Sequence, residues 1–502
     1  MQEIELKFGL SEEAAAAVEA TLRARGAQTE AIESHYWDSA DRRLARAGMS
    51  LRLRRSGAAW EQTVKAAGPV PVDRLEETVP RGGDAGANAP APEPALHAGS
   101  AAGPLLDAAL ARRGGGSVAL EPVYTSAVRR AALRIEALGA ELELALDRGV
   151  VRAGDRSQPI CELEVELKGG NVGALIAVGR ANVDVHAMWL STITKARRGE
   201  SLAEAAGAAR AVKAKPARID AGADGPAIFR AVLRSCLDQV LANASIVAAG
   251  DGDDEVVHQL RVGIRRLRTA ARELGAWRGA LGFAWEAPAA EAFRALGAWR
   301  DRRSVAAMVE HRLAAAGSPV PTLGGGGPDE GADPVAIVRA PAFQHALLDL
   351  LAFVLEPQRA AAAVGDGVVA DGERPATFVA RRLDRLHGQL RRDAKRFEDL
   401  AQADRHRVRK RLKRLRYLGE LVAPLYKSAR VGRFARALEP AQDALGSYID
   451  LVVSTRLAHE TIDAGDARAW FNVGWLRAQQ PRAIERCGKR LREVVAADPY
   501  WR

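Results

Sequence analysis

The sequence predicts an α+β multidomain protein, with an antiparallel β domain followed by an all-α domain. Residues 1–200 contain short runs in which charged and apolar side chains alternate, as in strands that are polar on one face. From residue 227 onward, apolar residues recur at spacings of three and four, which is typical of long helices. The length of 502 residues is too great for one ordinary domain. Two or three hydrophobic cores are therefore expected.

Shifts in composition predict the domain boundaries. The expected bounds are 1–203 for the first domain, 204–226 for an alanine-rich linker and 227–502 for the second domain. The segment SPVPTLGGGGPDEGADP at 318–334 interrupts the helical pattern. It divides the second domain into halves of about residues 227–317 and 335–502.

The cysteines and the N-terminal residues bear on the cellular compartment. Cys161, Cys236 and Cys487 lie far apart and form no CxxC pair. This argues against a disulfide framework and a zinc site, and it suits a reducing compartment. The N-terminus lacks the features of a signal peptide, and no uninterrupted apolar run reaches the length of a membrane span. We expect a cytoplasmic protein without a membrane partner.

Positive charge is concentrated in the second part of the chain. The formal net charge is +10, but residues 1–212 carry a net charge of −2 and the remainder a net charge of +12. A basic surplus of this size predicts a polyanionic partner for the helical region, such as nucleic acid, anionic lipid or a phosphate polymer.

The alternating runs of the first domain carry long acidic and basic side chains. In EIELK, Glu3, Glu5 and Lys7 share one strand face, and in CELEVELKGG, Glu162 and Glu164 do the same. Similar runs are SLRLRR, WEQTVK, RLEE, AVRRAALRIE and ELELALDRG. Any one of them could be a solvated strand face. Together they fit a closed antiparallel barrel with a charged, wet lumen, in which acids gather for a metal and bases for phosphate.

These motifs, with TKARRG at 194–199, occur in the order found in CYTH domains, the triphosphate tunnel metalloenzymes. Residues 1–200 most resemble the bacterial inorganic triphosphatases of that family. The resemblance implies that a divalent ion, Mg²⁺ or Mn²⁺, is held by Glu3, Glu5, Glu162 and Glu164, with Asp147 as a further ligand. The catalytic set is then Glu3, Glu5, Lys7, Glu162 and Glu164. The implied triphosphate-binding residues are Lys7, Arg52, Arg54, Lys65, Arg74 and Arg130, with Lys168 and Lys195 as further candidates. Glu76 either contacts the metal or holds Arg74 in place.

The second domain contains an internal repeat. HQLRVGIRRLR at 258–268 and HRVRKRLKRLR at 406–416 are 148 positions apart, and LGAWRD at 296–301 matches LGSYID at 445–450. On a helix, the His and basic residues of each copy form one stripe, within an arc of roughly 80° in the first copy, and the apolar residues form the opposite stripe. A basic stripe is often only a solvated face. Because the stripe is duplicated, an anionic ligand is the better interpretation.

The repeat resembles the CHAD domain, a helical family of two four-helix halves. The resemblance implies a basic groove that binds inorganic polyphosphate. The implied residues are His258, Arg261, Arg265, Arg266, Arg268, His406, Arg409, Lys413, Arg414 and Arg416. The second copy has Glu420 where the first has Arg272, so the two sides of the groove are expected to be unequal. Nucleic acid is the less favoured ligand, because aromatic side chains for base stacking are scarce near the stripes.

The predicted function is metal-dependent hydrolysis of inorganic triphosphate in the tunnel, with polyphosphate bound by the helical domain. Polyphosphate granules are then a candidate location. One alternative is an adaptor that binds phosphate polymers without catalysis. Another is an enzyme that acts on an organic triphosphate, either thiamine triphosphate or ATP.

Overall fold

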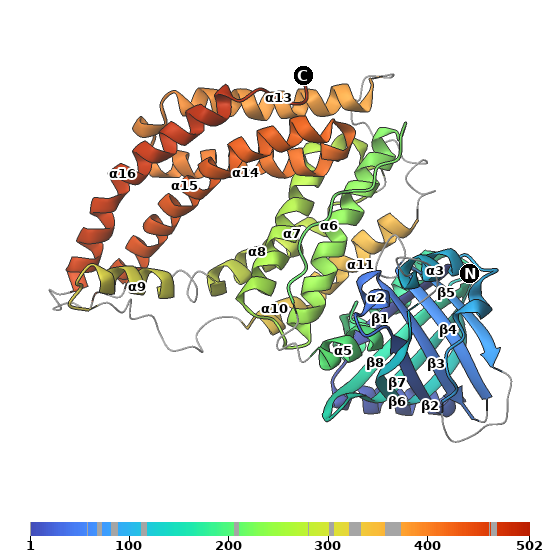
Figure 1. Cartoon of the computed structure of the whole chain (residues 1–502). Helices are drawn as coiled ribbons and strands as arrows, with labels where there is room; N and C mark the ends of the chain where they lie inside the picture. Colours follow the sequence, from blue (N-terminus) through green and yellow to red (C-terminus); the bar gives the residue numbers. More distant parts are fainter. Residues whose placement is uncertain are drawn as a thin grey trace. The chain divides into compact units, whose positions relative to one another are not determined.

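The structure is a computed structural model of the whole chain (Figure 1). It describes residues 2–57, 59–67, 73–81, 89–111, 118–204, 210–279, 281–300, 306–320, 333–356, 373–460, 462 and 469–502. The side chains of Glu3 and Arg74, and the whole of Asp301, lie outside the described residues. The roles predicted for Glu3 and Arg74 therefore stay predictions.

The N-terminal part is an antiparallel sheet that closes on itself. Its strands are β1 (Gln2–Gly9), β2 (Gln28–Asp38), β3 (Met49–Ser56), β4 (Ala59–Ala67), β5 (Asp73–Arg81), β6 (Glu121–Ala137), β7 (Ala140–Ala153), β8 (Arg156–Gly169) and β9 (Trp189–Leu190). They are ordered β5-β4-β3-β2-β6-β7-β8-β1-β9, and β1 also pairs with β5. Because β1 pairs with both β8 and β5, the ends of the sheet meet and form a barrel.

Alternation along the strands separates the barrel lumen from the outer wall. In β1, Leu6 and Phe8 are fully buried on the outer face, and Glu5 and Lys7 point the other way. The register of the neighbouring strands places Lys7 opposite Glu164 and Asp147 opposite Glu162. The lumen is therefore lined by charged side chains, as the sequence predicts.

Short helices cover the barrel and its rim. They are α1 (Glu12–Ala24), α2 (Arg43–Arg46), α3 (Gly103–Leu110), α4 (Val172–His186) and α5 (Lys195–Ala203). Three of them begin at side-chain caps: Ser11 Oγ accepts a hydrogen bond from Ala14 N at 3.2 Å, Asn171 Oδ1 accepts one from Ala174 N at 3.0 Å, and Thr194 Oγ1 accepts one from Arg197 N at 3.0 Å. The cap at Thr194 fixes the start of α5, whose first residue is Lys195.

Helix α11 (Pro341–Leu355), which follows α10 (Pro334–Arg339), packs on α4. Gln344 is fully buried there and accepts a hydrogen bond from Leu190 N of β9 at 2.8 Å. Arg180 of α4 forms an ion pair with Asp349 of α11. The first compact unit accordingly consists of Met1–Val212, Leu241–Val256 and Val338–Leu355. Two segments of the predicted helical domain thus belong to the unit that contains the barrel.

The second compact unit is helical and consists of Lys213–Val240, Val257–Ile337 and Glu356–Arg502. The remaining long helices are α6 (Gly225–Ala248), α7 (Asp254–Glu273), α8 (Glu286–Arg300), α9 (Ala306–Ala315), α13 (Pro375–Ala394), α14 (Gln402–Val422), α15 (Ser428–Glu460) and α16 (Ala469–Ala496). Helices α13, α14, α15 and α16 pack in a ring as a four-helix bundle.

The two copies of the repeat form most of α7 and α14. Their apolar stripes are buried, as Ile264 and Leu267 of α7 and Leu412 of α14 show. This burial leaves the basic stripes of the two helices on the side away from the core. The predicted fold class, an antiparallel β-barrel followed by a helical region, is confirmed.

Helix α6 has the length and apolar composition of a membrane span, and it is alone in this among the described helices. Its most apolar window is 78% buried inside the protein. Burial of this extent is typical of a core helix.

Candidate functional site

Three carboxylates meet in the barrel lumen. Asp147 of β7 and Glu162 of β8 are neighbours in the strand register, and Glu164 follows two residues later on the same face. Each side chain offers a carboxylate oxygen, and these oxygens lie within 4.8 Å of one another. Asp147 and Glu162 are fully buried, and the side chain of Glu164 is 14% exposed. Such a group of hard oxygen atoms suits a divalent cation.

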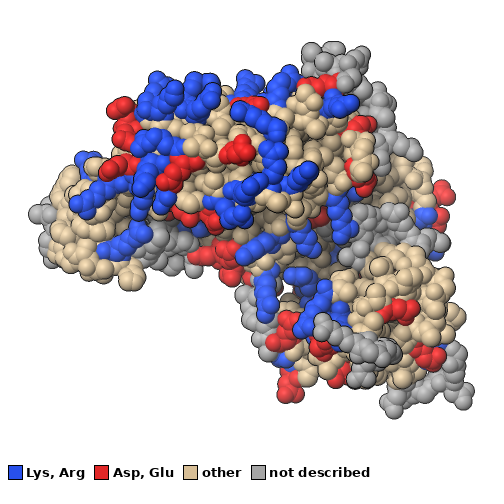
Figure 2. All heavy atoms as spheres, turned by 45° about the horizontal axis from the view of Figure 1, so that its top comes forward, with Lys and Arg blue, Asp and Glu red and all other residues tan. Residues whose placement is uncertain are grey.

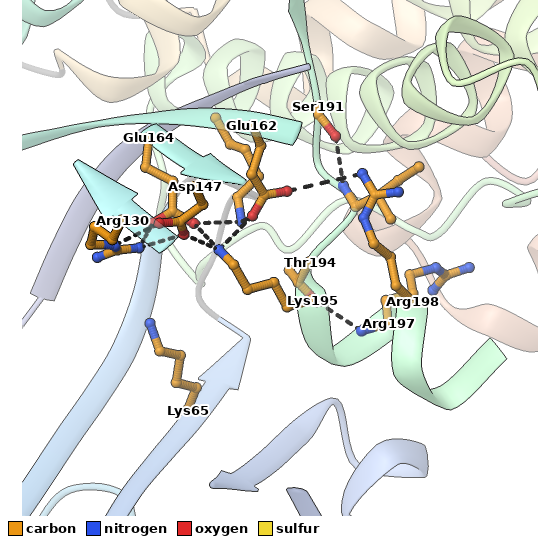
Figure 3. A network of polar contacts seen from close by, with 12 residues as sticks. Lys65, Arg130, Asp147, Glu162, Glu164, Ser191, Thr194, Lys195, Arg197 and Arg198 are labelled. Atoms are coloured by element: carbon orange, nitrogen blue, oxygen red, sulfur yellow. Dashed lines mark hydrogen bonds and ion pairs between the residues drawn. The ribbon is translucent and has the colours of Figure 1, made fainter. Parts of the chain in front are cut away.

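Three basic side chains contact these carboxylates, and two of them, Arg130 and Lys195, are labelled in Figure 3. Arg130 of β6 donates two hydrogen bonds to Asp147, at 2.8 Å from Nε and 2.7 Å from Nη2, and a third to Glu164 Oε2 at 2.6 Å. Lys195 Nζ lies 2.6 Å from Asp147 Oδ2, 2.5 Å from Glu162 Oε1 and 3.0 Å from Glu164 Oε1. Lys7 Nζ lies 3.2 Å from Glu162 and 2.8 Å from Glu164. We call these six residues the lumen cluster.

The lumen cluster holds its charges despite its burial. Burial by itself raises the pKa of Glu162 and Glu164, but Lys195 and Lys7 outweigh this effect and lower the pKa of both carboxyls. Burial likewise opposes the charged form of Lys195, but Asp147, Glu162 and Glu164 raise its pKa well above its ordinary value. At neutral pH Glu162 and Glu164 are therefore anionic and Lys195 is cationic.

Further cations line the lumen from β3 and β4. Lys65 points toward the lumen cluster (Figure 3) and forms an ion pair with Glu76. Arg52 contacts the same carboxylate at 3.6 Å from Nη2 to Oε1, and Arg54 lies 2.9 Å from Glu61. Glu76 thus contacts Lys65 and Arg52. These side chains are only partly buried and are placed to receive an anion in the lumen.

One oxygen of the lumen cluster supports a metal site. Glu162 Oε2 is buried and accepts no hydrogen bond within the described residues. Its neighbour Arg198 of α5 lies 3.9 Å away, beyond hydrogen-bond distance. A buried carboxylate oxygen without a hydrogen bond is costly unless a ligand satisfies it. Asp147, Glu162 and Glu164 therefore fit a divalent cation.

A second basic region lies on α7 and α14 of the helical unit. Lys413 of α14 is close enough to Arg265 and Arg261 of α7 to be influenced by their charges. Burial lowers the pKa of Lys413 to about 6, and Arg265, Arg409 and Arg261 add to this effect. The basic stripes of the two repeats therefore converge. Lys and Arg side chains are also abundant on the face of the molecule drawn in Figure 2.

Comparison with known families agrees with both regions. Residues 1–199 match the model of the CYTH domain, and residues 231–459 match the model of the CHAD domain. The chain contains a CYTH domain and a CHAD domain.

Parts of the chain are similar to known proteins. The inorganic triphosphatase of Haemophilus influenzae is 34% identical over 83 residues, which are 16% of this chain and 24% of that protein. The chain thus matches about a quarter of the length of that relative. The crystal structure of the CHAD domain from the plant Ricinus communis is 29% identical, with a TM-score of 0.47, and the match covers 58% of this chain and 98% of that one. A Hippeastrum protein described as an adenylyl cyclase with a dominant triphosphatase activity is 17% identical, with a TM-score of 0.29, and covers 40% of this chain and 96% of that one.

The CYTH domain brings together most of the predicted tunnel residues, but not all of them. Glu5 is buried in the lumen, yet its carboxylate is not a member of the three-carboxylate group. The strand register explains this. Glu5 of β1 lies opposite Glu166 of β8, whereas Lys7 is the residue of β1 that lies opposite Glu164. Lys168 lies 2.7 Å from Glu166 and 3.8 Å from Glu143, so it too is outside the lumen cluster.

Two of the arginines predicted to bind polyphosphate in the CHAD domain point away from the basic stripes. Arg266 is only 2% exposed and donates a hydrogen bond to Gln239 of α6 at 3.0 Å, which makes it a core residue. Arg414 contacts the buried carboxylate of Glu273 at 3.4 Å. Each follows a stripe residue directly, and a helix turns about 100° per residue, so each points away from the stripe.

One residue of the CYTH site received no role in the sequence analysis. Arg198 lies within the TKARRG motif, three residues after Lys195 and therefore on the same face of α5. It is the basic side chain next to Glu162 Oε2. Helical spacing from Lys195 was the signal that could have identified it.

Proposed function

We propose that this protein hydrolyses inorganic triphosphate in the lumen of the CYTH barrel with the help of a divalent cation, and that its CHAD domain binds inorganic polyphosphate. The observation that carries the first part is the lumen cluster, in which three carboxylates and three cations meet inside one barrel. A site that pairs metal-binding acids with phosphate-binding bases suits a substrate made of phosphate groups.

The bases of the lumen have the chemistry needed to bind a triphosphate. Arginine forks match the non-bridging oxygens of a phosphate, and lysines act as point charges. Lys7 and Lys195 contact Glu162 and Glu164. A triphosphate would compete for these ammonium groups and draw them toward its own oxygens. The carboxylates released in this way become available to a cation, so substrate and cation should bind cooperatively.

Asp147, Glu162 and Glu164 are the residues that would hold the cation. Their oxygens favour Mg²⁺ or Mn²⁺ over softer metals. Such an ion, when bound, supplies positive charge that offsets the negative charge of the phosphate oxygens.

The electrostatics of the cluster also indicate how the chain contributes to catalysis. The lowered pKa of Glu162 and Glu164, which Lys195 and Lys7 cause against the effect of burial, makes both carboxylates weak general bases. The main contribution of the chain is therefore to position the triphosphate in line with a water molecule and to neutralise its charge.

A substrate panel tests the first part of the proposal. Phosphate release by the full chain is measured with tripolyphosphate, ATP and thiamine triphosphate, each with Mg²⁺, Mn²⁺ or a chelator. We expect the highest kcat/KM with tripolyphosphate and no turnover with the chelator. Preference for ATP or thiamine triphosphate would favour an organic substrate. Absence of turnover with all three would favour a non-catalytic adaptor.

The basic stripes of α7 and α14 support the second part of the proposal. Arg265 and Arg261 lie near Lys413, and together with burial they disfavour the charged form of Lys413 unless an anion compensates. A phosphate polymer needs no aromatic stacking partners, whereas single-stranded nucleic acid relies on them. We expect the full chain to bind long-chain polyphosphate more tightly than RNA of equal charge. In Arg265→Glu, we expect the affinities for polyphosphate and RNA to become equal. Equal affinities in the unaltered protein would contradict the proposed binding of polyphosphate.

A further inference from the structure

An aromatic ring, that of Phe293, lies among the arginines of the first repeat. Phe293 is a half-buried residue of α8, which runs beside α7 (Figure 1). The guanidinium carbon of Arg265 lies 4.8 Å from the centroid of its ring, that of Arg261 lies 5.0 Å away, and that of Arg268 lies 5.9 Å away. All three distances are within the range of cation–π interactions. These arginines are the basic stripe of the first repeat.

The next turn of α8 leaves space for one of these arginines. A Cβ atom at Gly297 would lie 2.8 Å from Arg261 Nη2, so a side chain at this position would displace the guanidinium. Gly297 is the glycine of the repeated LG motif. Ring and glycine together form a surface on α8 that accommodates the arginines of α7.

An aromatic ring holds an arginine in a different way from a carboxylate. The ring attracts the guanidinium through its face, leaves the net positive charge intact and uses none of the N–H donors in the guanidinium plane. A carboxylate would neutralise the charge and occupy two of the donors. Arg265, whose guanidinium lies nearest the ring, therefore remains able to bind a phosphate.

In the second repeat, Arg416 is held by polar side chains instead of an aromatic ring. At the spacing of 149 residues that relates the two LG motifs, Phe293 corresponds to Gln442. Gln442 accepts a hydrogen bond from Arg416, and Glu420 forms an ion pair with the same guanidinium at 2.5 Å. The charge of Arg416 is thus balanced within its own half. Lys413, the neighbour of Arg416 in the second stripe, lies near Arg265 and Arg261 instead.

We propose that Phe293 is a positioning residue that holds Arg265 in a phosphate-binding arrangement, so that Arg265 of the first repeat contributes more polyphosphate affinity than Arg416 of the second. This inference rests on the proposed binding of polyphosphate by the CHAD domain. It assigns most of the polyphosphate affinity to the side of the groove formed by α7, where Phe293 positions the arginine.

The experiment measures the dissociation constant of the full chain for long-chain polyphosphate. Phe293→Leu keeps an apolar side chain and removes the ring, whereas Phe293→Tyr keeps the ring. We expect affinity to fall about tenfold with Leu and to stay within about twofold with Tyr. A matched control is Phe283→Leu, because Phe283 is an exposed residue whose ring contacts Arg278, outside both stripes. This control should leave the affinity unchanged.

A second pair of variants tests the asymmetry without altering the ring. We expect Arg265→Gln to weaken binding about tenfold and Arg416→Gln to weaken it less than threefold. Equal losses in this pair would overturn the asymmetry. Equal losses with Leu and Tyr at position 293, or no loss with either, would overturn the positioning role. If the unaltered chain does not bind polyphosphate, the proposed function itself fails, and that result differs from all of these.

Discussion

Lys195 Nζ lies 2.6 Å from Asp147 Oδ2, inside the barrel lumen. Lys195 is the first residue of α5, and Asp147 belongs to β7, so this contact joins a helix at the rim to the wall of the barrel. The same ammonium also contacts Glu162 and Glu164. A cation supplied by the chain thus lies among the three carboxylates that fit a divalent ion. The consequences of this arrangement can be tested one residue at a time.

Replacement of Lys195 should affect both the rate and its pH dependence. We expect Lys195→Met to lower kcat/KM for tripolyphosphate about 100-fold at pH 7, because a phosphate-binding charge is lost. Burial raises the pKa of Glu162 and Glu164, and Lys195 is the largest of the charges that lower it again. Without Lys195 these carboxylates should bind protons at higher pH. The fall of activity on the acid side should therefore begin at a higher pH in the variant.

A full pH–rate profile for phosphate release checks this prediction. Lys195→Arg serves as the control, because it keeps the positive charge. In this variant, activity should fall at the same low pH as in the unaltered protein. If activity of Lys195→Met falls at the same low pH as that of the unaltered protein, Lys195 does not lower the pKa of the carboxyls as proposed.

The packing of α5 should control the position of Lys195. A Cβ atom at Gly199 would lie only 2.0 Å from the ring of Tyr124 in β6, so Gly199→Ala must displace the helix or the ring. We expect phosphate release to fall about tenfold, because a small misplacement of a charged group weakens its interactions. Gly388 of α13 provides the control, since a Cβ atom there would meet no neighbour within 4 Å. Full activity of Gly199→Ala would show that the exact position of α5 is unimportant.

The packing of α11 on the barrel unit should contribute to stability. Gln344 accepts a hydrogen bond from Leu190 N at 2.8 Å and donates one to Val338 O at 2.7 Å. Gln344→Leu leaves both buried backbone groups without a partner, which should cost about 1–3 kcal/mol for each. Denaturant unfolding of the full chain measures the change in the free energy of unfolding. The exposed Gln402→Leu is the control, and equal stability of the two variants would rule out this contribution.

Polyphosphate binding should weaken as the pH rises. In the free protein, burial lowers the pKa of Lys413 to about 6, and the charges of Arg265, Arg409 and Arg261 contribute. A bound polyanion favours the charged form and raises this pKa, so binding takes up a proton. The additional affinity is fully present below pH 6 and is lost as the pH rises toward the pKa of the bound state. Titrations between pH 5 and 9 should show this trend in the unaltered protein.

The matched variant for this prediction is Lys413→Arg, which keeps its charge throughout the range. The pH dependence of its polyphosphate affinity should be smaller than that of the unaltered protein. An equal dependence in both proteins would assign the effect to another group.

The parts of this structure that depend on local periodicity could be predicted from the sequence. Alternation in β1 and β8 correctly placed Lys7, Glu162 and Glu164 on one face, and helical spacing correctly separated the basic and apolar stripes of α7 and α14. These predictions hold because the direction of a side chain follows from two fixed geometries, the pleated strand and the helix.

Features that depend on how distant segments align could not be predicted in the same way. Alternation gave the correct face for Glu5, but only the register shows that it pairs with Glu166 rather than with Glu164. The contact of Gln344 with Leu190 spans more than 150 residues of sequence, and no local pattern signals it. The burial of Arg266 follows from a hydrogen bond to Gln239 of another helix. Each of these features is a tertiary contact.

The central claim is that Asp147, Glu162 and Glu164 act on a triphosphate inside the barrel. The most direct measurement is kcat/KM for tripolyphosphate with Mg²⁺ or Mn²⁺ in Glu162→Gln, compared with Glu141→Gln. Glu141 lies on β7, and its exposed side chain pairs with the exposed Arg134. We expect kcat/KM to fall at least about 100-fold in Glu162→Gln and to stay unchanged in Glu141→Gln. Equal activity of the two variants would contradict the claim.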